Sequence, residues 1–211
     1  ISVHMSWQCL YEDTAWEEQH DRGLLNLSIV GCNFIKSYFS GKDNHQVSDL
    51  VLAKDFVLNY FAKSVESCPR KTQMIYLFRN DIYEKVRRGI FRDVLEEAWY
   101  TGLPPIHTSE QQIQQDKRQG VTPPQPDETT PFDCLEQHVL MDLDGDGYDE
   151  PYIITIAKDS LAVLRIVTGF EREEDIERDA QERIICIHPM QYYTKVPFIP
   201  SPDGGIYDIG F

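Results

Sequence analysis

Long apolar runs are missing from this sequence. None approaches the ~18 consecutive apolar residues that a membrane-spanning helix needs, and the mean hydropathy is −0.42. We therefore expect no association with a membrane. The first residues, Ile1–His4, have neither the basic nor the apolar region of a signal peptide, and they lack an initiator methionine. We expect the chain to be a piece of a longer protein.

Cysteine is scarce and widely spaced. The five cysteines are odd in number and form no CxxC pair, which argues against a disulfide scaffold and favours a reducing compartment. One four-ligand zinc set can be drawn from Cys134, His138, Cys186 and His188, but it requires two separate segments to meet in space. Buried cysteines without a metal are commoner, so we do not favour zinc.

Catalytic signatures are also missing. The sequence contains no GxSxG, GxxxxGK[ST] or HExxH motif, and no GxGxxG followed by a helix. Its acidic residues are numerous but form no distinctive catalytic pair. We therefore expect that the protein is not an enzyme.

Positive charge is in short supply, above all in the second half. The chain has 20 Lys and Arg against 35 Asp and Glu, which gives a formal net charge of −15. Residues 1–100 hold 14 acids and 12 bases, whereas residues 101–211 hold 21 acids and 8 bases. Because an acidic surface repels phosphate, we expect no tight, salt-dependent binding of nucleic acid. An acidic surface that faces DNA without gripping it stays open.

The first hundred residues show both helical and strand patterns. Helices are predicted over residues 11–30, from Asn80 or Asp81 to Arg88, and over Phe91–Tyr100. Strands are predicted over Cys32–Phe39, over one or two segments of Val47–Tyr60, and over Thr72–Phe78. A turn at residues 41–44 would make the first two strands a hairpin.

Residues 101–131 change the character of the chain. Six prolines interrupt a segment rich in Gln, Thr and Asp, which predicts a linker or a long surface excursion with a short helix near Glu110–Lys117. The sequence thus divides into a helical and β-hairpin part (1–100), this segment (101–131) and a β-rich part (132–211). We predict an α+β fold, with N-terminal helices and a small antiparallel sheet followed by a mainly antiparallel half.

Strand patterns dominate the last part of the chain. They cover Cys134–Asp142, Pro151–Ala157, Leu161–Val167 and Arg183–His188. The highly charged segment Glu171–Arg183 is interpreted as a solvated helix face or loop, and the segment from Pro197 to Gly205 as extended and then turning.

One segment carries a sharp chemical pattern. Acids alternate at Asp142, Asp144 and Asp146, with glycines between and after them, as in the first half of a calcium loop. A hard dication needs six to eight oxygens at about 2.3–2.6 Å, and the glycines let the backbone curl tightly enough to supply them. The Tyr148 carbonyl and the Glu150 carboxylate would complete the predicted ligand set.

The match to a calcium loop is partial. A full EF-hand loop has a glutamate at its twelfth position, where this chain has Ile153, and strands rather than helices are expected on both sides. The alternative is a solvated hairpin turn that tolerates its charge. If a cation binds, we expect Ca²⁺ first and Mg²⁺ second. This loop suggests two functions: a calcium-binding interaction module and a metal-dependent hydrolase.

Several segments, taken together and in this order, resemble portal proteins of tailed bacteriophages. They are Ile29–Phe39, Asn59–Ser64, Leu135–His138, Leu143–Ile153, Leu161–Val167 and Pro197–Phe211. The resemblance is closest in the last segment, PFIPSPDGGIYDIGF, and weakest in the proline-rich one. None of these segments is a catalytic signature, so their number and order carry the likeness.

The resemblance implies a head-to-tail connector: a homo-oligomeric ring, usually of twelve copies, at one vertex of the capsid in the virion. The ring would assemble in the host cytoplasm, which suits free cysteines. DNA would pass through its channel, without tight binding, during viral genome packaging and ejection. The terminase motor and the tail or head-completion proteins would dock on it. The present chain would correspond to the wing region, with the long stem helix following Gly210-Phe211, and we expect it to be monomeric by itself.

Overall fold

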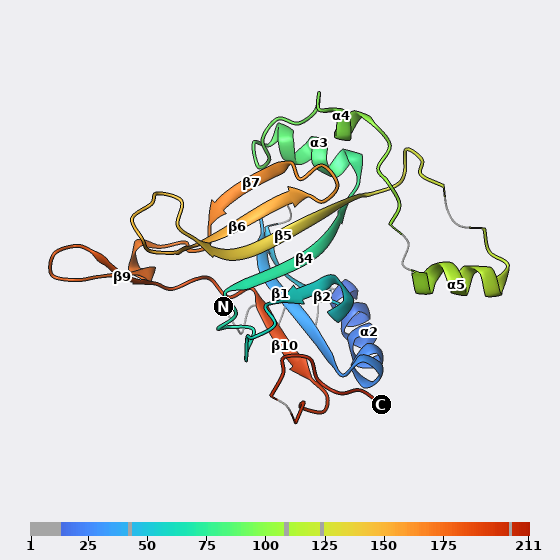
Figure 1. Cartoon of the computed structure of the whole chain (residues 1–211), viewed down its shortest axis with the longest axis horizontal. Helices are drawn as coiled ribbons and strands as arrows, with labels where there is room; N and C mark the ends of the chain where they lie inside the picture. Colours follow the sequence, from blue (N-terminus) through green and yellow to red (C-terminus); the bar gives the residue numbers. More distant parts are fainter. Residues whose placement is uncertain (1–13, 42–43, 108–109, 123–124, 203) are drawn as a thin grey trace. The chain divides into compact units, whose positions relative to one another are not determined.

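The computed structural model describes residues 14–41, 44–107, 110–122, 125–202 and 204–211 (Figure 1). The chain folds into two compact units. Of the described residues, the first unit holds those up to Gln73, Gln137–Tyr152 and Thr168–Phe211, and the second holds Met74–Glu136 and Ile153–Val167. Both units are discontinuous in sequence. They do not coincide with the three consecutive parts expected from composition, because residues 101–131 lie wholly within the second unit.

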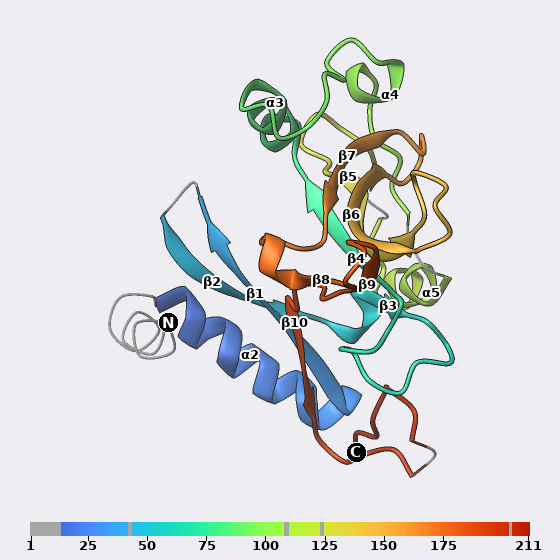
Figure 2. The same ribbon diagram turned by 90° about the vertical axis from the view of Figure 1, so that its left-hand side faces the viewer.

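The first unit is built on a three-stranded antiparallel sheet covered by a helix. The strand order is β10 (Tyr193–Pro197), β1 (Cys32–Ser40), β2 (His45–Val51), and helix α2 (Thr14–Val30) packs on β1 and β2, as Figure 2 shows. The predicted helix and hairpin are therefore confirmed within the described residues. Positions 11–13 of the helix and 42–43 of the turn, like His4 and Cys9, lie outside them.

Aromatic and apolar side chains fill the core of the first unit. Its largest fully buried side chains are Phe34 and Phe56, whose ring centroids are 4.7 Å apart, and Tyr193 packs 4.5 Å from Phe56. Short strand β3 (Phe56–Leu58), reached through the 3-10 turn η1 (Ala53–Asp55), supplies Phe56. Alternation along β1 sends Cys32 and Phe34 into this core.

The last residues of the chain lie against the junction of α2 and β1. Phe198 N–H donates to the Gly31 carbonyl at 2.8 Å, and Phe211 N–H donates to the Ser28 carbonyl at 2.9 Å. Gly31 ends the helix with a φ of +94°, as expected for a residue that must adopt the left-handed conformation. A Cβ on Gly31 would lie 2.4 Å from the Asp208 carbonyl oxygen, so glycine is required there for space as well.

A five-stranded sheet has the order β3-β4-β5-β6-β7 (Figure 1). Its further strands are β4 (Arg70–Leu77), β5 (Phe132–Met141), β6 (Glu150–Ala157) and β7 (Val163–Thr168). The core of the second unit contains Ile82, Val94, Cys134 and Leu164, all almost completely buried. The helices are α3 (Arg79–Arg87), α4 (Ala98–Thr101) and α5 (Glu110–Gln119). The α+β class is thus confirmed.

The predicted helix over Phe91–Tyr100 is wrong for most of its length. Only α4 is helical, because the segment before it is held in turns: the Asp93 carboxylate accepts from Leu95 N–H at 3.2 Å, and the Val94 carbonyl accepts from Glu97 N–H at 3.0 Å. A side chain that bonds a nearby backbone amide competes with the helix ladder. The apolar spacing that suggests a helix instead serves to bury Phe91 and Val94.

Other boundaries also need correction. The N-cap of α3 is Phe78, not Asn80 or Asp81; the Asp81 carboxylate accepts from Phe78 N–H at 2.9 Å from inside the first turn. The charged segment Glu171–Arg183 contains the 3-10 turn η2 (Glu173–Asp175) and strand β8 (Ile176–Arg178), which pairs with β9 (Ile184–Ile187). Strand β10 went unpredicted. None of the described helices combines the length and apolar character needed to cross a membrane.

Replacing Gly31 tests how strongly the backbone packing limits side chains. Gly31→Ala should lower the free energy of unfolding in urea by about 1–3 kcal/mol more than Gly204→Ala, because only Gly31 faces a clash. Gly204 is the matched control, since its φ of +66° is also left-handed but an added Cβ would meet nothing within 4 Å. Equal losses for the two variants would contradict the packing argument.

Candidate metal-binding loop

The acidic loop joins β5 to β6 and lies in the first unit. Its backbone turns at Gly145 and Gly147, whose φ values are +78° and +91°. A Cβ on either glycine would meet nothing within 4 Å, so glycine is favoured there by conformation rather than by space. The sharp curl expected from the sequence is present.

Backbone amides hold the carboxylates of this loop in place. Asp142 accepts through Oδ1 from Gly145 N–H at 2.6 Å and through Oδ2 from Gly147 N–H at 2.9 Å. Asp144 accepts from Asp146 N–H at 3.2 Å, and Asp146 accepts from Tyr148 N–H at 2.8 Å. These bonds partly offset the repulsion between the acids. They lower the pKa of Asp142, mainly through the amides of Gly145 and then Gly147.

Three of the five predicted ligand residues come together. One carboxylate oxygen from each of Asp142, Asp144 and Asp146 lies within 4.8 Å of the others, and all three residues are exposed. A carboxylate has about four acceptor sites, so the backbone bonds leave lone pairs for a cation. Hard oxygen ligands of this kind suit Ca²⁺ or Mg²⁺.

The other two predicted residues make contacts of their own. The Tyr148 hydroxyl accepts from Ile187 N–H at 2.9 Å, which ties the loop to β9. Glu150 lies outside the carboxylate group, because its side chain accepts a hydrogen bond from the Tyr152 hydroxyl two residues along the strand. This bond is the largest cause that raises the pKa of Tyr152 to about 12.

The four residues of the possible zinc set do not form a site. In the described part of the chain, the three aspartates are the only group of three or more acids, histidines or cysteines close enough to share an ion. Cys134 is fully buried, and burial raises the pKa of its thiol to about 12, so it stays protonated. His138 packs edge-on against Tyr193, and His188 pairs with Glu177 at 2.9 Å.

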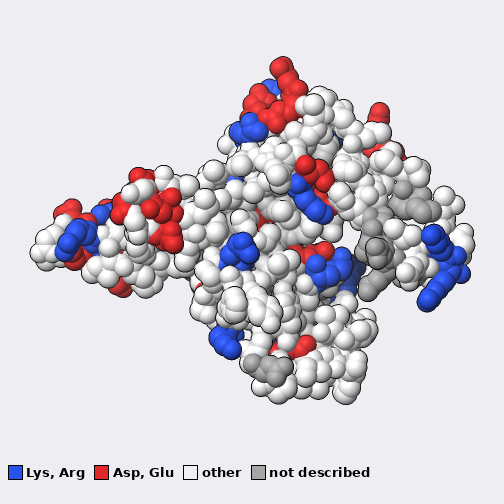
Figure 3. All heavy atoms as spheres, in the orientation of Figure 1, with Lys and Arg blue, Asp and Glu red and all other residues white. Residues whose placement is uncertain are grey.

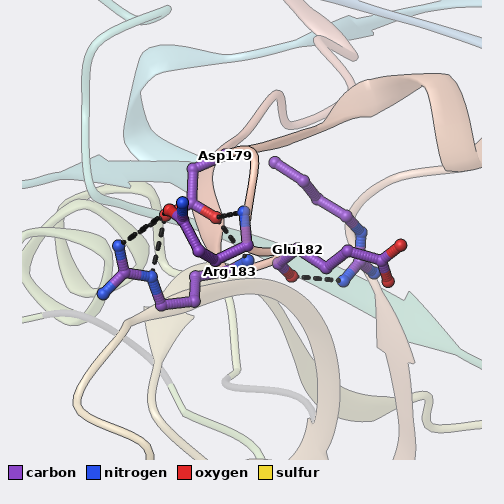
Figure 4. Close-up of polar contacts among 5 residues, drawn as sticks. Asp179, Glu182 and Arg183 are labelled. Atoms are coloured by element: carbon purple, nitrogen blue, oxygen red, sulfur yellow. Dashed lines mark hydrogen bonds and ion pairs between the residues drawn. The ribbon is translucent and has the colours of Figure 1, made fainter.

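The β8–β9 turn shows a second carboxylate that organises a loop. Asp179 accepts from the backbone amides of Gln181 and Arg183 and pairs with the Arg183 guanidinium at 2.7 Å (Figure 4). Acidic and basic side chains lie together around this hairpin in Figure 3, near the β9 label of Figure 1. Part of the charge of this segment is therefore neutralised by an ion pair within it.

Three basic side chains cluster at the end of α3 and contact neighbours of their own. Lys85 lies over the Phe91 ring, Arg87 over Tyr83, and Arg88 pairs with Glu84 at 2.5 Å. These contacts agree with a helix end that also suits the helix dipole. They give no support to a phosphate site.

The sequence-based interpretation missed two polar features of the structure. Asn33, on β1, is almost completely buried and donates to the Gly23 carbonyl of α2 at 2.5 Å. His107 pairs with Asp159 at 2.5 Å, although 52 positions separate them in the sequence. The polar side chain of Asn33 within an apolar strand pattern is a sequence signal that its position is unusual. No local sequence feature indicates that His107 pairs with Asp159.

No family model matches the chain, and no curated protein matches it significantly.

The acid titration of Asp142 can be measured directly. The pKa of Asp142 is lower in the folded chain than in the unfolded chain, where it is about 3.9. Its hydrogen bonds therefore contribute fully to stability above about pH 3.9, and this contribution is lost as the pH falls through the lower folded pKa. We expect the amide NMR signals of Gly145 and Gly147 to shift together below about pH 4. Asp142→Asn should abolish that shared transition, whereas its persistence in the variant would assign it to another group.

Proposed function

We propose that this chain is a structural part of a portal protein of a tailed bacteriophage. The observation that carries the proposal is that two of the segments that resemble portal proteins pack together, although they come from opposite ends of the chain. Residues 29–39 and 197–211 are more than 150 positions apart, yet their backbones are in contact: Phe198 N–H donates to the Gly31 carbonyl at 2.8 Å, and a Cβ on Gly31 would lie 2.4 Å from the Asp208 carbonyl oxygen. The residues that carry the resemblance at the two ends of the chain thus belong to the same part of the fold.

Polar contacts hold the second of these segments in place. The side chain of Asp208 is buried; its Oδ2 lies 2.7 Å from Lys195 Nζ, and its Oδ1 accepts from Ser201 N–H at 3.1 Å. The Tyr207 hydroxyl donates to the Phe56 carbonyl at 2.9 Å. A buried carboxylate that lost its cation would be costly, so the segment is firmly fixed in this arrangement.

On this proposal the protein works as an oligomeric ring at the capsid vertex. Further copies of the chain, the capsid, the terminase and the tail or head-completion proteins are its partners, and DNA passes through the channel. The excess of acids in residues 101–211 favours sliding, because firm phosphate contacts would act as brakes. The proposed role needs no catalytic step, and we propose that the chain is not an enzyme.

Electron microscopy of the complete gene product tests the proposal. Negative-stain images should show closed rings with a central hole, because portal subunits assemble around a DNA channel. Residues 1–211 alone serve as the control and should remain monomeric in light scattering, because the proposal assigns ring closure to the stem helix that is expected to follow Phe211. Monomers of the complete product at high concentration would contradict the portal assignment.

The acidic loop favours a second candidate role, calcium binding, which is compatible with the first. We propose that Asp142, Asp144 and Asp146 hold a Ca²⁺ ion, with Mg²⁺ second, and that the Tyr148 carbonyl adds a further oxygen. The convergence of three carboxylate oxygens within 4.8 Å supports this proposal. An ion that binds only the folded loop would stabilise it. As an independent activity, the same loop would make the chain a calcium-binding interaction module.

Isothermal calorimetry tests the ion. We expect saturable Ca²⁺ binding with a Kd on the order of 10⁻⁴–10⁻³ M, because three carboxylates are a small ligand set. Asp146→Asn should weaken binding at least about tenfold, the effect of losing ~1.4 kcal/mol. Asp149→Asn is the matched control, since it removes the same charge from the loop but lies outside the carboxylate group. No heat in the parent protein, or equal weakening by both variants, would exclude the site.

A further inference from the structure

An open groove runs along β7, the strand at one edge of the five-stranded sheet (Figure 1). Its volume is about 730 Å³. Residues 161–167 form one wall, and the turn at residues 89–92, which follows α3, forms the other. Both walls belong to the second unit. Ligand-binding sites in proteins have volumes of this order, so the groove has room for a short extended peptide.

The outer edge of β7 carries backbone groups that no described strand pairs. Strand β6 lies along the inner edge, where Gly169 N–H, directly after β7, donates to the Pro151 carbonyl at 2.7 Å. On the outer edge, the Leu164 carbonyl accepts from Arg92 N–H at 2.9 Å. Because successive residues direct their backbone groups to opposite edges, Ile166 shares the outer edge with Leu164. In the described residues no strand lies beyond β7, so the N–H and carbonyl of Ile166 have no strand partner there.

Only the start of this edge is covered. Arg92 donates to the Leu164 carbonyl through its backbone and to the Val163 carbonyl through its side chain. Natural proteins usually shield an edge strand along its length, because its unpaired backbone groups are a template for another strand. From Ile166 onward, β7 lacks a shield of this kind in the described structure.

The exposed side chains along the groove are apolar and basic. Ile166 is 50% exposed, and Ile90 on the other wall is 39% exposed. Arg165 lies on the opposite face of β7 from Ile166, since side chains alternate along a strand. Arg165 forms no ion pair with any described residue, whereas Arg92 pairs with Glu97 at 2.8 Å. The groove lining contains these two arginines and no acid, although the whole chain has a net charge of −15.

We propose that β7 binds an extended segment of a partner protein, which joins the sheet as a further strand and alternates acidic with apolar side chains. Its backbone would pair with the open edge at Ile166. Because side chains of paired strands share faces, its apolar residues would lie beside Ile166 and its acids beside Arg165. A nucleic acid is disfavoured, since its backbone has no amide to pair with a strand and the exposed isoleucines favour an apolar side chain. This inference does not depend on the proposed portal role.

A capped peptide of alternating glutamate and valine, EVEVEVE, tests the inference. In protein-observed NMR of the 211-residue chain, it should cause saturable shifts at residues 89–92 and 161–167. The outward amide of Ile166 should exchange with solvent at least about tenfold more slowly in the complex, because it gains a hydrogen bond. The lysine peptide KVKVKVK should bind at least about tenfold more weakly, because it places like charges beside Arg165.

Methylation of the peptide backbone separates strand pairing from general attraction. Since the amides of successive residues point to opposite edges, N-methylation of one set, the valines or the glutamates, should abolish binding, and N-methylation of the other should preserve it. Equal binding of the two methylated peptides would overturn strand pairing. Shifts of the same residues by single-stranded oligothymidylate, as strong as those by EVEVEVE, would overturn the proposal in favour of a phosphate site.

Variants of the chain test the two sides of the groove. Arg165→Glu should weaken binding of EVEVEVE at least about tenfold. Arg118→Glu on α5, outside the groove, is the matched control and should bind as the parent does. Ile166→Pro removes the outward N–H at a position where an edge strand tolerates proline, and it should abolish binding, whereas Ile166→Ala should still bind.

If Ile166→Pro does not fold, the arginine variants and the methylated peptides decide the question. Equal binding to the parent and to both arginine variants, or no shifts at about 5 mM peptide, a concentration that would reveal even a weak complex, would overturn the proposal.

Discussion

The close backbone contact between residues 29–31 and 208–210 is the constraint on which the first unit depends. Added Cβ atoms on Gly31 and Gly210 would lie 2.4 Å and 2.2 Å from opposing carbonyl oxygens, so the two segments touch with almost no space between them. The contact lies next to the pairing of β10 with β1, which makes β1 the central strand of its sheet. With both edges of β1 paired, one face can close over the aromatic core and the other can receive α2.

That arrangement separates what the sequence predicts from what it does not. Helix α2, the β1–β2 hairpin and strands β6 and β7 were predictable, because their apolar periodicity and turn residues are local. Strand β10 was not, because Tyr193–Pro197 is short, mixed in polarity and stabilised by a partner more than 150 positions earlier. Burial of Asn33 likewise depends on a helix carbonyl ten residues away across a chain reversal. In both cases tertiary pairing decides the structure and local preference does not.

The acidic loop shows the same division within nine residues. The curl from Asp142 to Gly147 was predictable, since each carboxylate bonds an amide two to five positions further on, and glycine permits the required φ values. Glu150 departs from its expected place because it already belongs to β6. Strand alternation places residues i and i+2 on one face, so its carboxylate meets Tyr152 instead of the aspartates.

Several polar side chains of the first unit form hydrogen bonds with the backbone of another segment. Gln19 accepts from Leu50 N–H, Tyr148 accepts from Ile187 N–H, and Tyr207 donates to the Phe56 carbonyl. Each bond links elements far apart in sequence, so the first unit resists opening at any one of them. A subunit that must keep its shape while DNA moves past it needs such links more than it needs reactive groups. The use of polar groups in this unit is therefore consistent with the proposed structural role.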